Sequence, residues 1–242
     1  MLKQLKEIMK NIHVYALFLL FVFCSSCGGE NKPGLPKKNI KAETKEIVNS
    51  PGPNERDIHT MYEYTDSIGK RLIIQNGYPR GGIKYTDPHG NEYAYAVFWT
   101  RIINETDNQL ELKFDFPINS YEISNLPGKY VKVLLPADTM TLDKISLFNY
   151  GQTDVESFLD NNIHKPSSLK RTINPKESSG FYFLMLILTE GATGMTRTGL
   201  SLKGQDLFYK ISRYSSTKPI TLLDEKEIHC GSINLKNLML RK

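Results

Sequence analysis

The chain has 242 residues, of which 40% are hydrophobic and 24% charged, and its formal net charge at pH 7 is +5. These are ordinary values for a globular protein. The basic residues are scattered, with no run of five or six, so the charge does not indicate a nucleic-acid partner.

The N-terminus has the three parts of a secretory signal peptide. Three lysines precede an apolar run at residues 14–23, and the segment CSSC follows at residues 24–27. An uncleaved transmembrane anchor is the alternative, but the run has roughly ten apolar residues and a span needs about twenty. We therefore expect residues 1–26 to be removed.

The segment SSCGG at residues 25–29 resembles the lipobox of bacterial lipoproteins, in the form found in Bacteroidetes. The resemblance implies that Cys27 becomes the first residue, with a lipid on its thiol. It also implies a place in the cell envelope, most simply the outer membrane, on its periplasmic or surface side. The sequence departs from the motif at Cys24, where Leu is usual.

Residues 28–57 are rich in Gly, Pro, Asn, Lys and Glu, and their apolar residues are isolated. Such a segment buries too little apolar surface to offset the entropy lost on ordering. We therefore expect residues 27–57 to form a lipidated N-terminus and a disordered linker, and residues 58–242 to form the folded domain.

Short apolar, β-branched runs separated by turn residues follow. The clearest strand is at residues 110–116, where Leu and Phe alternate with charged residues, so that one face lies in a core and the other in water. The run at 181–189 is apolar throughout, which favours a strand covered on both faces. Strands are predicted at residues 71–75, 93–103, 110–116, 130–135, 145–150, 181–189, 206–212 and 233–240.

One short helix is expected after residue 152. Thr153 and Glu156 have the spacing of a capping box, in which each side chain satisfies a main-chain donor at the helix start. Phe158 and Leu159 would then pack against the core.

Many strands and little helix predict a mainly β domain, namely an antiparallel β-sandwich with one short helix. Two stretches, at residues 100–117 and 173–188, resemble units of immunoglobulin-like accessory domains. This resemblance concerns architecture and not activity.

The sequence contains no motif that indicates catalysis. Ser167 and Lys170 match the S-x-x-K spacing of some serine nucleophiles, but no companion motif follows, so we interpret the match as coincidence. The glycine-rich segment at residues 191–199, with Arg197, has two interpretations. It could hold an anion, but a mobile hairpin loop is the preferred interpretation. No catalytic residue and no cofactor are predicted.

Metal ligands are not clustered in the sequence. The mature histidines, His59, His89, His164 and His229, are isolated from one another. Asp87, His89 and Asn91 alternate on one turn and are a weak metal candidate, but a solvated turn is the simpler interpretation. We predict no metal site. Cys230, the one cysteine left after lipidation, is predicted to be a small buried side chain.

Two features bear on the surface of the domain. Six tyrosines crowd residues 62–95, and exposed tyrosines suit protein or carbohydrate contact, although Tyr is also common in strands. Ser67 and Thr139 lie in Asp-Ser/Thr-apolar tripeptides that resemble the O-glycosylation sequon of Bacteroidetes. Chance matches to so short a motif are the alternative.

The sequence thus predicts a lipid-anchored, non-catalytic envelope protein that binds a ligand or assists assembly. The partners expected are the membrane, through Cys27, and a protein or carbohydrate ligand. An envelope hydrolase with a site built from distant residues, or a structural subunit of an outer-membrane complex, are the alternatives.

Overall fold

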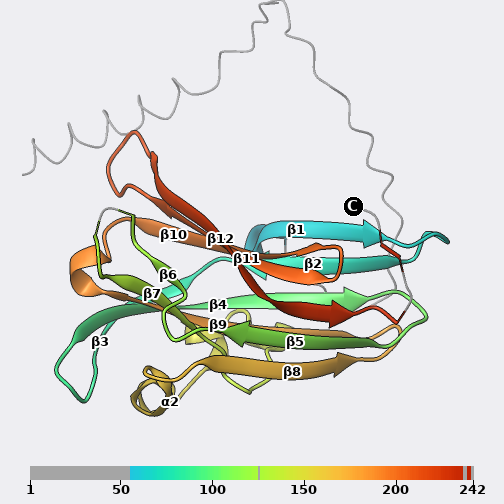
Figure 1. The fold of residues 1–242 in the computed structure, drawn as a ribbon, viewed down its shortest axis with the longest axis horizontal. Helices are drawn as coiled ribbons and strands as arrows, with labels where there is room; N and C mark the ends of the chain where they lie inside the picture. The colour runs from blue at the N-terminus through green and yellow to red at the C-terminus, as the bar shows by residue number, and fades with distance from the viewer. Residues whose placement is uncertain (1–54, 125, 237–238, 241–242) are drawn as a thin grey trace, which may run out of the picture. The chain divides into compact units, whose positions relative to one another are not determined.

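The computed structural model describes residues 55–124, 126–236 and 239–240. The predicted signal peptide, Cys27 and nearly all of the predicted linker lie outside the described residues. The described part is mainly β, with one α-helix, and its sheets are antiparallel and curled (Figure 1). No helix in this part is long and apolar enough to cross a membrane.

Seven strands form the larger sheet, in the order β1-β2-β4-β9-β7-β6, with β3 paired to the free half of β4. Their bounds are β1 Ile58–Thr65, β2 Arg71–Gly77, β3 Arg80–Thr86, β4 Glu92–Asn104, β6 Tyr121–Glu122, β7 Tyr130–Leu134 and β9 Ser178–Leu188.

Five strands form the smaller sheet, in the order β10-β11-β12-β5-β8. Their bounds are β5 Leu110–Phe116, β8 Ser167–Ile173, β10 Met195–Lys203, β11 Asp206–Tyr214 and β12 Leu222–Asn234. The α-helix is α2, Val155–Asn162, and short 3₁₀ turns occupy η1 Glu55–Asp57, η2 Leu142–Lys144, η3 Phe148–Gly151 and η4 Thr189–Gly191.

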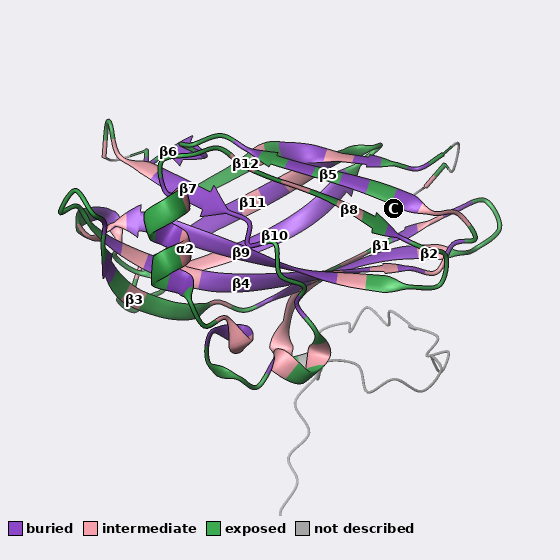
Figure 2. Ribbon diagram, turned by 90° about the horizontal axis from the view of Figure 1, so that it is seen from below, coloured by how far each residue is buried: buried purple, intermediate pink, exposed green. Residues whose placement is uncertain are grey.

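The two sheets pack their apolar faces against each other, and this contact is the main core. Phe114 of β5 meets Phe181 of β9 with ring centroids 5.1 Å apart, and Phe183 of β9 stacks on Tyr209 of β11 at 4.7 Å. The predicted alternation in β5 is confirmed, because Leu110, Leu112, Phe114 and Phe116 are buried while the charged residues between them are exposed. Figure 2 shows the buried positions concentrated along β4 and β9.

A second core covers the other face of the larger sheet. Alternate residues of β9, namely Tyr182, Leu184 and Leu186, pack there against side chains from residues 140–163. The prediction that β9 is covered on both faces is therefore confirmed. Tyr182 also donates a 2.8 Å hydrogen bond to the carbonyl oxygen of Tyr150, which fixes the covering segment to the sheet.

Two predicted strands are wrong. Residues 145–150 form turns, because Asn149 and Tyr150 both adopt left-handed backbone conformations, with φ of 46° and 55°. Of the described residues in 233–240, only the first two belong to a strand, namely the end of β12, which stops at Asn234. The predicted strands do not include β1, β3, β6, β8 and β10, and they include only the end of β12.

The predicted helix is present, but its predicted cap is wrong. The N-cap residue of α2 is Asp154, and no side chain caps the helix start. Thr153 donates its hydroxyl to the carboxylate of Asp154 at 3.3 Å. Leu159 is fully buried and Phe158 packs beside it, as expected.

Candidate functional site

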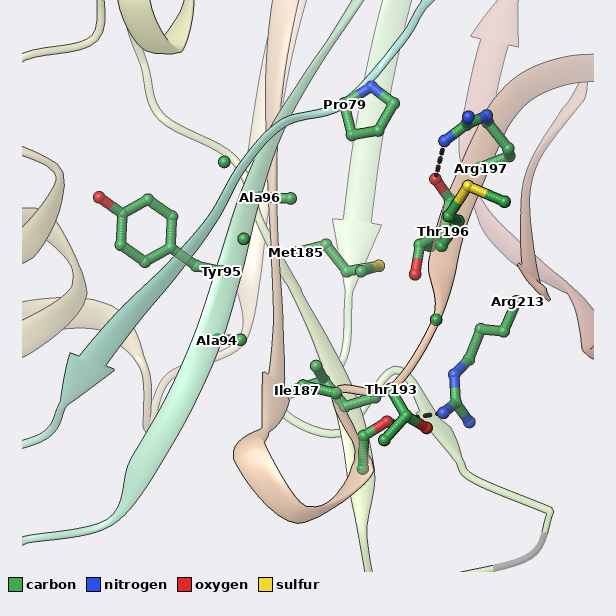
Figure 3. Close-up of a pocket in the computed structure, with 16 residues that line it drawn as sticks. Pro79, Ala94, Tyr95, Ala96, Met185, Ile187, Thr193, Thr196, Arg197 and Arg213 are labelled. Atoms are coloured by element: carbon green, nitrogen blue, oxygen red, sulfur yellow. Dashed lines mark hydrogen bonds between the residues drawn. The ribbon is translucent and has the colours of Figure 1, made fainter. Parts of the chain in front are cut away.

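A cavity of about 220 Å³ opens at one end of the space between the two sheets (Figure 3). Strands β3, β4 and β9 of the larger sheet line one side, and β10 and β11 of the smaller sheet line the other. The lining residues are Pro79, Gly81, Gly82, Ala94, Tyr95, Ala96, Met185, Ile187, Gly191, Ala192, Thr193, Gly194, Met195, Thr196, Arg197 and Arg213. We call this cavity the arginine pocket.

Small side chains in β4 leave the space open. Ala94 and Ala96 lie on the face of β4 that looks toward the smaller sheet, whereas the ring of Tyr95 points the opposite way (Figure 3). Because residues two apart in a strand share a face, Ala94 and Ala96 together leave a strip with short side chains, which we call the alanine strip. Met185 and Ile187 of β9 continue this strip, so one wall of the pocket is apolar.

The glycine-rich segment forms another wall. Gly194 has a φ of +91°, and a Cβ atom there would overlap the carbonyl oxygen of Tyr214. Only glycine allows so close an approach to β11 at that φ. The segment from Gly191 to Gly194 is therefore held against the end of β11, where Arg213 lies.

Arg213 is a buried guanidinium with an incomplete set of partners. The residue is 4% exposed, and its Nη2 donates a 2.6 Å hydrogen bond to the carbonyl oxygen of Gly191. Its Nη1 is buried and has no hydrogen-bond partner, and no ion pair in the described part of the chain includes Arg213. Burying a charge without a counter-charge is expensive, so binding of an anion beside this side chain would be favourable.

Tyr121 and Asp224 lie near Arg213. Burial and the charge of Asp224 raise the pKa of Tyr121 to about 12, while Arg213 opposes that rise through its charge and through a side-chain hydrogen bond. No hydrogen bond of ordinary geometry joins the Tyr121 hydroxyl to either group, so this contact is weak. Asp224, the β12 neighbour of Arg213, instead accepts a 3.0 Å hydrogen bond from the hydroxyl of Ser124.

Arg197 supplies a second positive charge. Its guanidinium carbon lies 5.3 Å from the ring centroid of Tyr78, and its Nη1 donates a 2.9 Å hydrogen bond to the carbonyl oxygen of Thr196. The ring of His59 packs against Tyr78 at 5.2 Å. Burial, and secondly the charge of Arg197, lower the pKa of His59.

The turn beside Pro79 is fixed from the other side of the larger sheet. Tyr150 donates its hydroxyl to the carbonyl oxygen of Tyr78 at 2.6 Å, and the guanidinium of Arg80 lies 5.3 Å from the Tyr150 ring centroid. Tyr150, whose left-handed backbone is one reason that the predicted strand is absent, therefore holds the turn beside Pro79.

The described residues that line the pocket include two arginines, two threonines and a tyrosine, but no carboxylate, imidazole or thiol. Positive charge beside an apolar wall suits an anion with an apolar part.

The glycine-rich segment is not the hairpin loop that we preferred, because it connects β9 of the larger sheet to β10 of the smaller sheet. Residues 191–194 lie in the pocket wall, and the remainder belongs to β10. Arg197, which belongs to the less favoured anion-binding interpretation, lines the pocket, and so does Arg213, which the sequence analysis missed. No pattern in the neighbouring sequence indicates that Arg213 is buried, since its burial depends on the segment from Gly191 to Gly194.

The other candidates do not form a site. Ser167 and Lys170 lie on β8, where residues three apart point to opposite faces, so the S-x-x-K match is a coincidence. Cys230 is fully buried and donates its thiol to the carbonyl oxygen of Leu207 at 3.4 Å. Burial raises the pKa of this thiol. The interpretation of Cys230 as a buried side chain is confirmed.

The carboxylate of Asp87 is occupied by hydrogen bonds within its own turn. That carboxylate accepts hydrogen bonds from the main-chain N–H of His89 and from both nitrogens of Asn91. His164 lies 3.6 Å from it and its ring is 5.2 Å from that of His89, so two histidines that are distant in sequence meet here. Within the described residues, no three His, Cys, Asp or Glu side chains form a metal site.

The remaining histidines lie apart from this turn. His59 packs on Tyr78, as described above, and Nε2 of His229 lies 3.4 Å from a carboxylate oxygen of Asp206.

The tyrosine-rich stretch does not present a binding surface of six rings. Tyr62 is half-buried and Tyr78 is exposed, whereas the other four are packed in the cores, namely Tyr64, Tyr85, Tyr93 and Tyr95. The interpretation as ordinary strand tyrosines is the better one.

Ser67 is exposed in a turn, and Thr139 is exposed in the irregular segment that precedes Met140. The structure therefore leaves both side chains accessible, and their O-glycosylation stays a prediction. Comparisons of this chain with protein-family models, with curated proteins and with solved structures found no match.

Proposed function

We propose that this protein is lipid-anchored in the cell envelope through Cys27 and that its β domain binds an anionic ligand in the arginine pocket. The apolar run followed by SSCGG supports the anchor. On this proposal the domain is a non-catalytic binding module, and the outer membrane is its location.

The buried, unpaired guanidinium of Arg213 is the observation that carries the binding proposal. A charge 4% exposed that lacks an ion pair within the described residues is costly without a counter-ion. A bound anion would remove that cost, and Arg213 is one of the residues that line the pocket. Arg197 adds a second attraction for negative charge.

The lining supports binding rather than hydrolysis at this site. Hydrolysis needs a nucleophile or an acid-base pair whose pKa values suit the reaction. The threonines, tyrosine and arginines of the described lining do not supply such a pair. We therefore do not favour the hydrolase alternative for the arginine pocket.

We further propose that the domain is an immunoglobulin-like accessory domain. Both stretches that resemble such domains cross from one sheet to the other, the first from β4 to β5 and the second from β8 to β9. Crossings of this kind are typical of sandwiches with Greek-key connections. The curling of the sheets is the feature that departs from a flat sandwich.

The binding proposal is tested with the full mature chain, labelled with ¹⁵N and held in a neutral detergent. Acetate, hexanoate, sulfate and phosphate are titrated as sodium salts, with sodium chloride at equal ionic strength as the blank. We expect at least one of these anions to shift the amide signals of Gly191 and Gly194 in a saturable way. If none of the four does so, the arginine pocket is not an anion site and the proposal is wrong.

A further inference from the structure

The arginine pocket contains one buried positive group, the guanidinium of Arg213, rather than a cluster of positive groups. Arg213 lines one part of the pocket, and its buried Nη1 makes no hydrogen bond of ordinary geometry. In Figure 3 the guanidinium of Arg197 points to a different part of the pocket, beside Thr196. The buried guanidinium therefore neutralises a ligand group that carries one negative charge. A second negative charge on that ligand group would lose its hydration without gaining a positive partner.

The geometry of the guanidinium favours a planar anion. A guanidinium presents its N–H groups in a planar fork that fits a carboxylate. One nitrogen of this fork, Nη2, donates a hydrogen bond to the carbonyl oxygen of Gly191, and this bond fixes the plane of the guanidinium. A carboxylate that lies in this plane can accept from the remaining N–H groups.

The opposite wall has no polar group to hydrate or bond a ligand. It consists of Ala94 and Ala96 from β4, together with Met185 and Ile187 from β9. Burial of apolar surface against such a wall is favourable by about 25 cal/mol per Å². The part of the ligand that lies away from Arg213 should therefore be a hydrocarbon.

The size of the pocket limits the hydrocarbon. The volume of about 220 Å³ equals roughly seven water molecules at the density of the liquid. It is below the range of about 300–1,000 Å³ that holds drug-sized ligands. A short chain or one amino-acid side chain fits, whereas a membrane lipid with two long chains does not.

We infer that the arginine pocket binds a monocarboxylate on a short apolar group, with the carboxylate at Arg213 and the apolar group on the alanine strip. This inference rests on the proposed function above and names its ligand class. The same chemistry is found in a free short-chain acid and in the C-terminal residue of a peptide that ends in an aliphatic amino acid.

The test compares matched ligands by calorimetry on the full mature chain in a neutral detergent. Hexanoate should bind with a Kd on the order of 0.1–1 mM, as expected for so small a ligand. Hexanamide, which has the same shape without the charge, should bind at least tenfold more weakly. From acetate to hexanoate, each added methylene should tighten binding by up to about fourfold. N-acetyl-leucine represents the peptide source, and whichever of it and hexanoate binds more tightly identifies the source.

Three variants locate the binding. Arg213→Met should weaken hexanoate binding at least tenfold, and Arg213→Lys should weaken it less, because it keeps the charge. Ala96→Leu fills the alanine strip without touching the arginine and should also weaken binding at least tenfold. Lys170→Met is the control, since it removes an exposed cation on β8, and it should bind like the original chain. The thermal unfolding of each variant is recorded to show that it is folded.

The outcomes separate this inference from the proposed function. If phosphate or sulfate binds, Arg213→Met abolishes that binding and hexanoate does not bind, the anion site stands and the carboxylate inference is overturned. If hexanoate and hexanamide bind equally, the inference is likewise overturned. If no anion binds to the original chain, both proposals are wrong.

Discussion

The side-chain amide of Asn104, at the end of β4, donates a 3.0 Å hydrogen bond to the main-chain carbonyl oxygen of Asn174, in the turn between β8 and β9. The same amide nitrogen donates a 2.7 Å bond to the carbonyl of Asn108, and the amide oxygen accepts from the hydroxyl of Thr106 at 2.6 Å. Asn104 is fully buried. One side chain thus joins the two turns that lead from one sheet to the other.

Replacing Asn104 by Ala should destabilise the domain by about 2–4 kcal/mol, because several buried polar groups lose their partner at once. Urea unfolding followed by fluorescence measures the change. Gln109→Ala is the control. Gln109 also bonds to Asn174, at 3.0 Å, but does so at the exposed surface, so its loss should cost less than about 0.5 kcal/mol. Similar losses for both variants would show that Asn104 does not hold the turns together.

The alternation in β5 leads to a second prediction. Phe114 is fully buried between Phe181 and Phe183, so Phe114→Ala should cost about 3–5 kcal/mol. Lys113 is exposed and its ion pair with Asp115 lies at the surface, so Lys113→Ala should stay within about 0.5 kcal/mol. The same urea experiment measures both. Equal effects of the two substitutions would contradict the orientation of this strand.

The sequence was most informative where burial follows a local period. The alternation at residues 110–116 and the apolar run of β9 each predicted a strand, because the periodicity of a strand and the burial of its faces are visible in the residues themselves. Strands β8 and β10 carry several polar residues at the edges of the smaller sheet, so no such period marks them. At residues 145–150 the apolar pattern was misleading, because contacts of Tyr150 with distant residues fix a turn.

The candidate site could be predicted only in part. The glycines and Arg197 at residues 191–199 allowed an anion site as the less favoured of two interpretations, since that combination is local. Arg213, in contrast, lies in an ordinary strand sequence, and its burial arises only where Gly194 lets the chain approach β11. The alanine strip likewise could not be recognised from the sequence, because it lines a pocket only where the smaller sheet faces it.

Lipidation at Cys27, which lies outside the described residues, gives a third prediction. Cys27→Ala should release the mature chain from membrane pellets and abolish its labelling by radioactive palmitate, because the acyl chains supply the membrane affinity. Fractionation of cells followed by immunoblotting measures the release. Cys230→Ser removes the buried thiol of the domain and serves as the control. A Cys27→Ala protein that stays in the pellet with unchanged lipid labelling would rule out this anchor.

His59 gives a prediction for the dependence of stability on pH. Its pKa is lowered from 6.5 in the folded chain by burial and by Arg197. The unfolded chain therefore binds a proton at a higher pH than the folded chain does, so stability falls as the pH drops through the region below 6.5. His59→Gln should reduce this slope between about pH 7 and pH 5. The free energy of unfolding in urea, measured at several pH values, gives the slope. An unchanged slope in the variant would show that another group is responsible.

The most direct test of the arginine pocket is the stability of the domain as a function of anion concentration. A ligand that binds only the folded state stabilises it by RT ln(1 + [L]/Kd). Urea unfolding of the full mature chain should therefore move to higher denaturant as hexanoate is raised at constant ionic strength. Arg213→Met should show no such shift. Its stability without ligand should stay within about 2 kcal/mol of the original, because it loses the bond to Gly191 but also loses a buried unpaired charge. Equal shifts in both proteins, or none in either, would contradict the account that Arg213 binds a monocarboxylate.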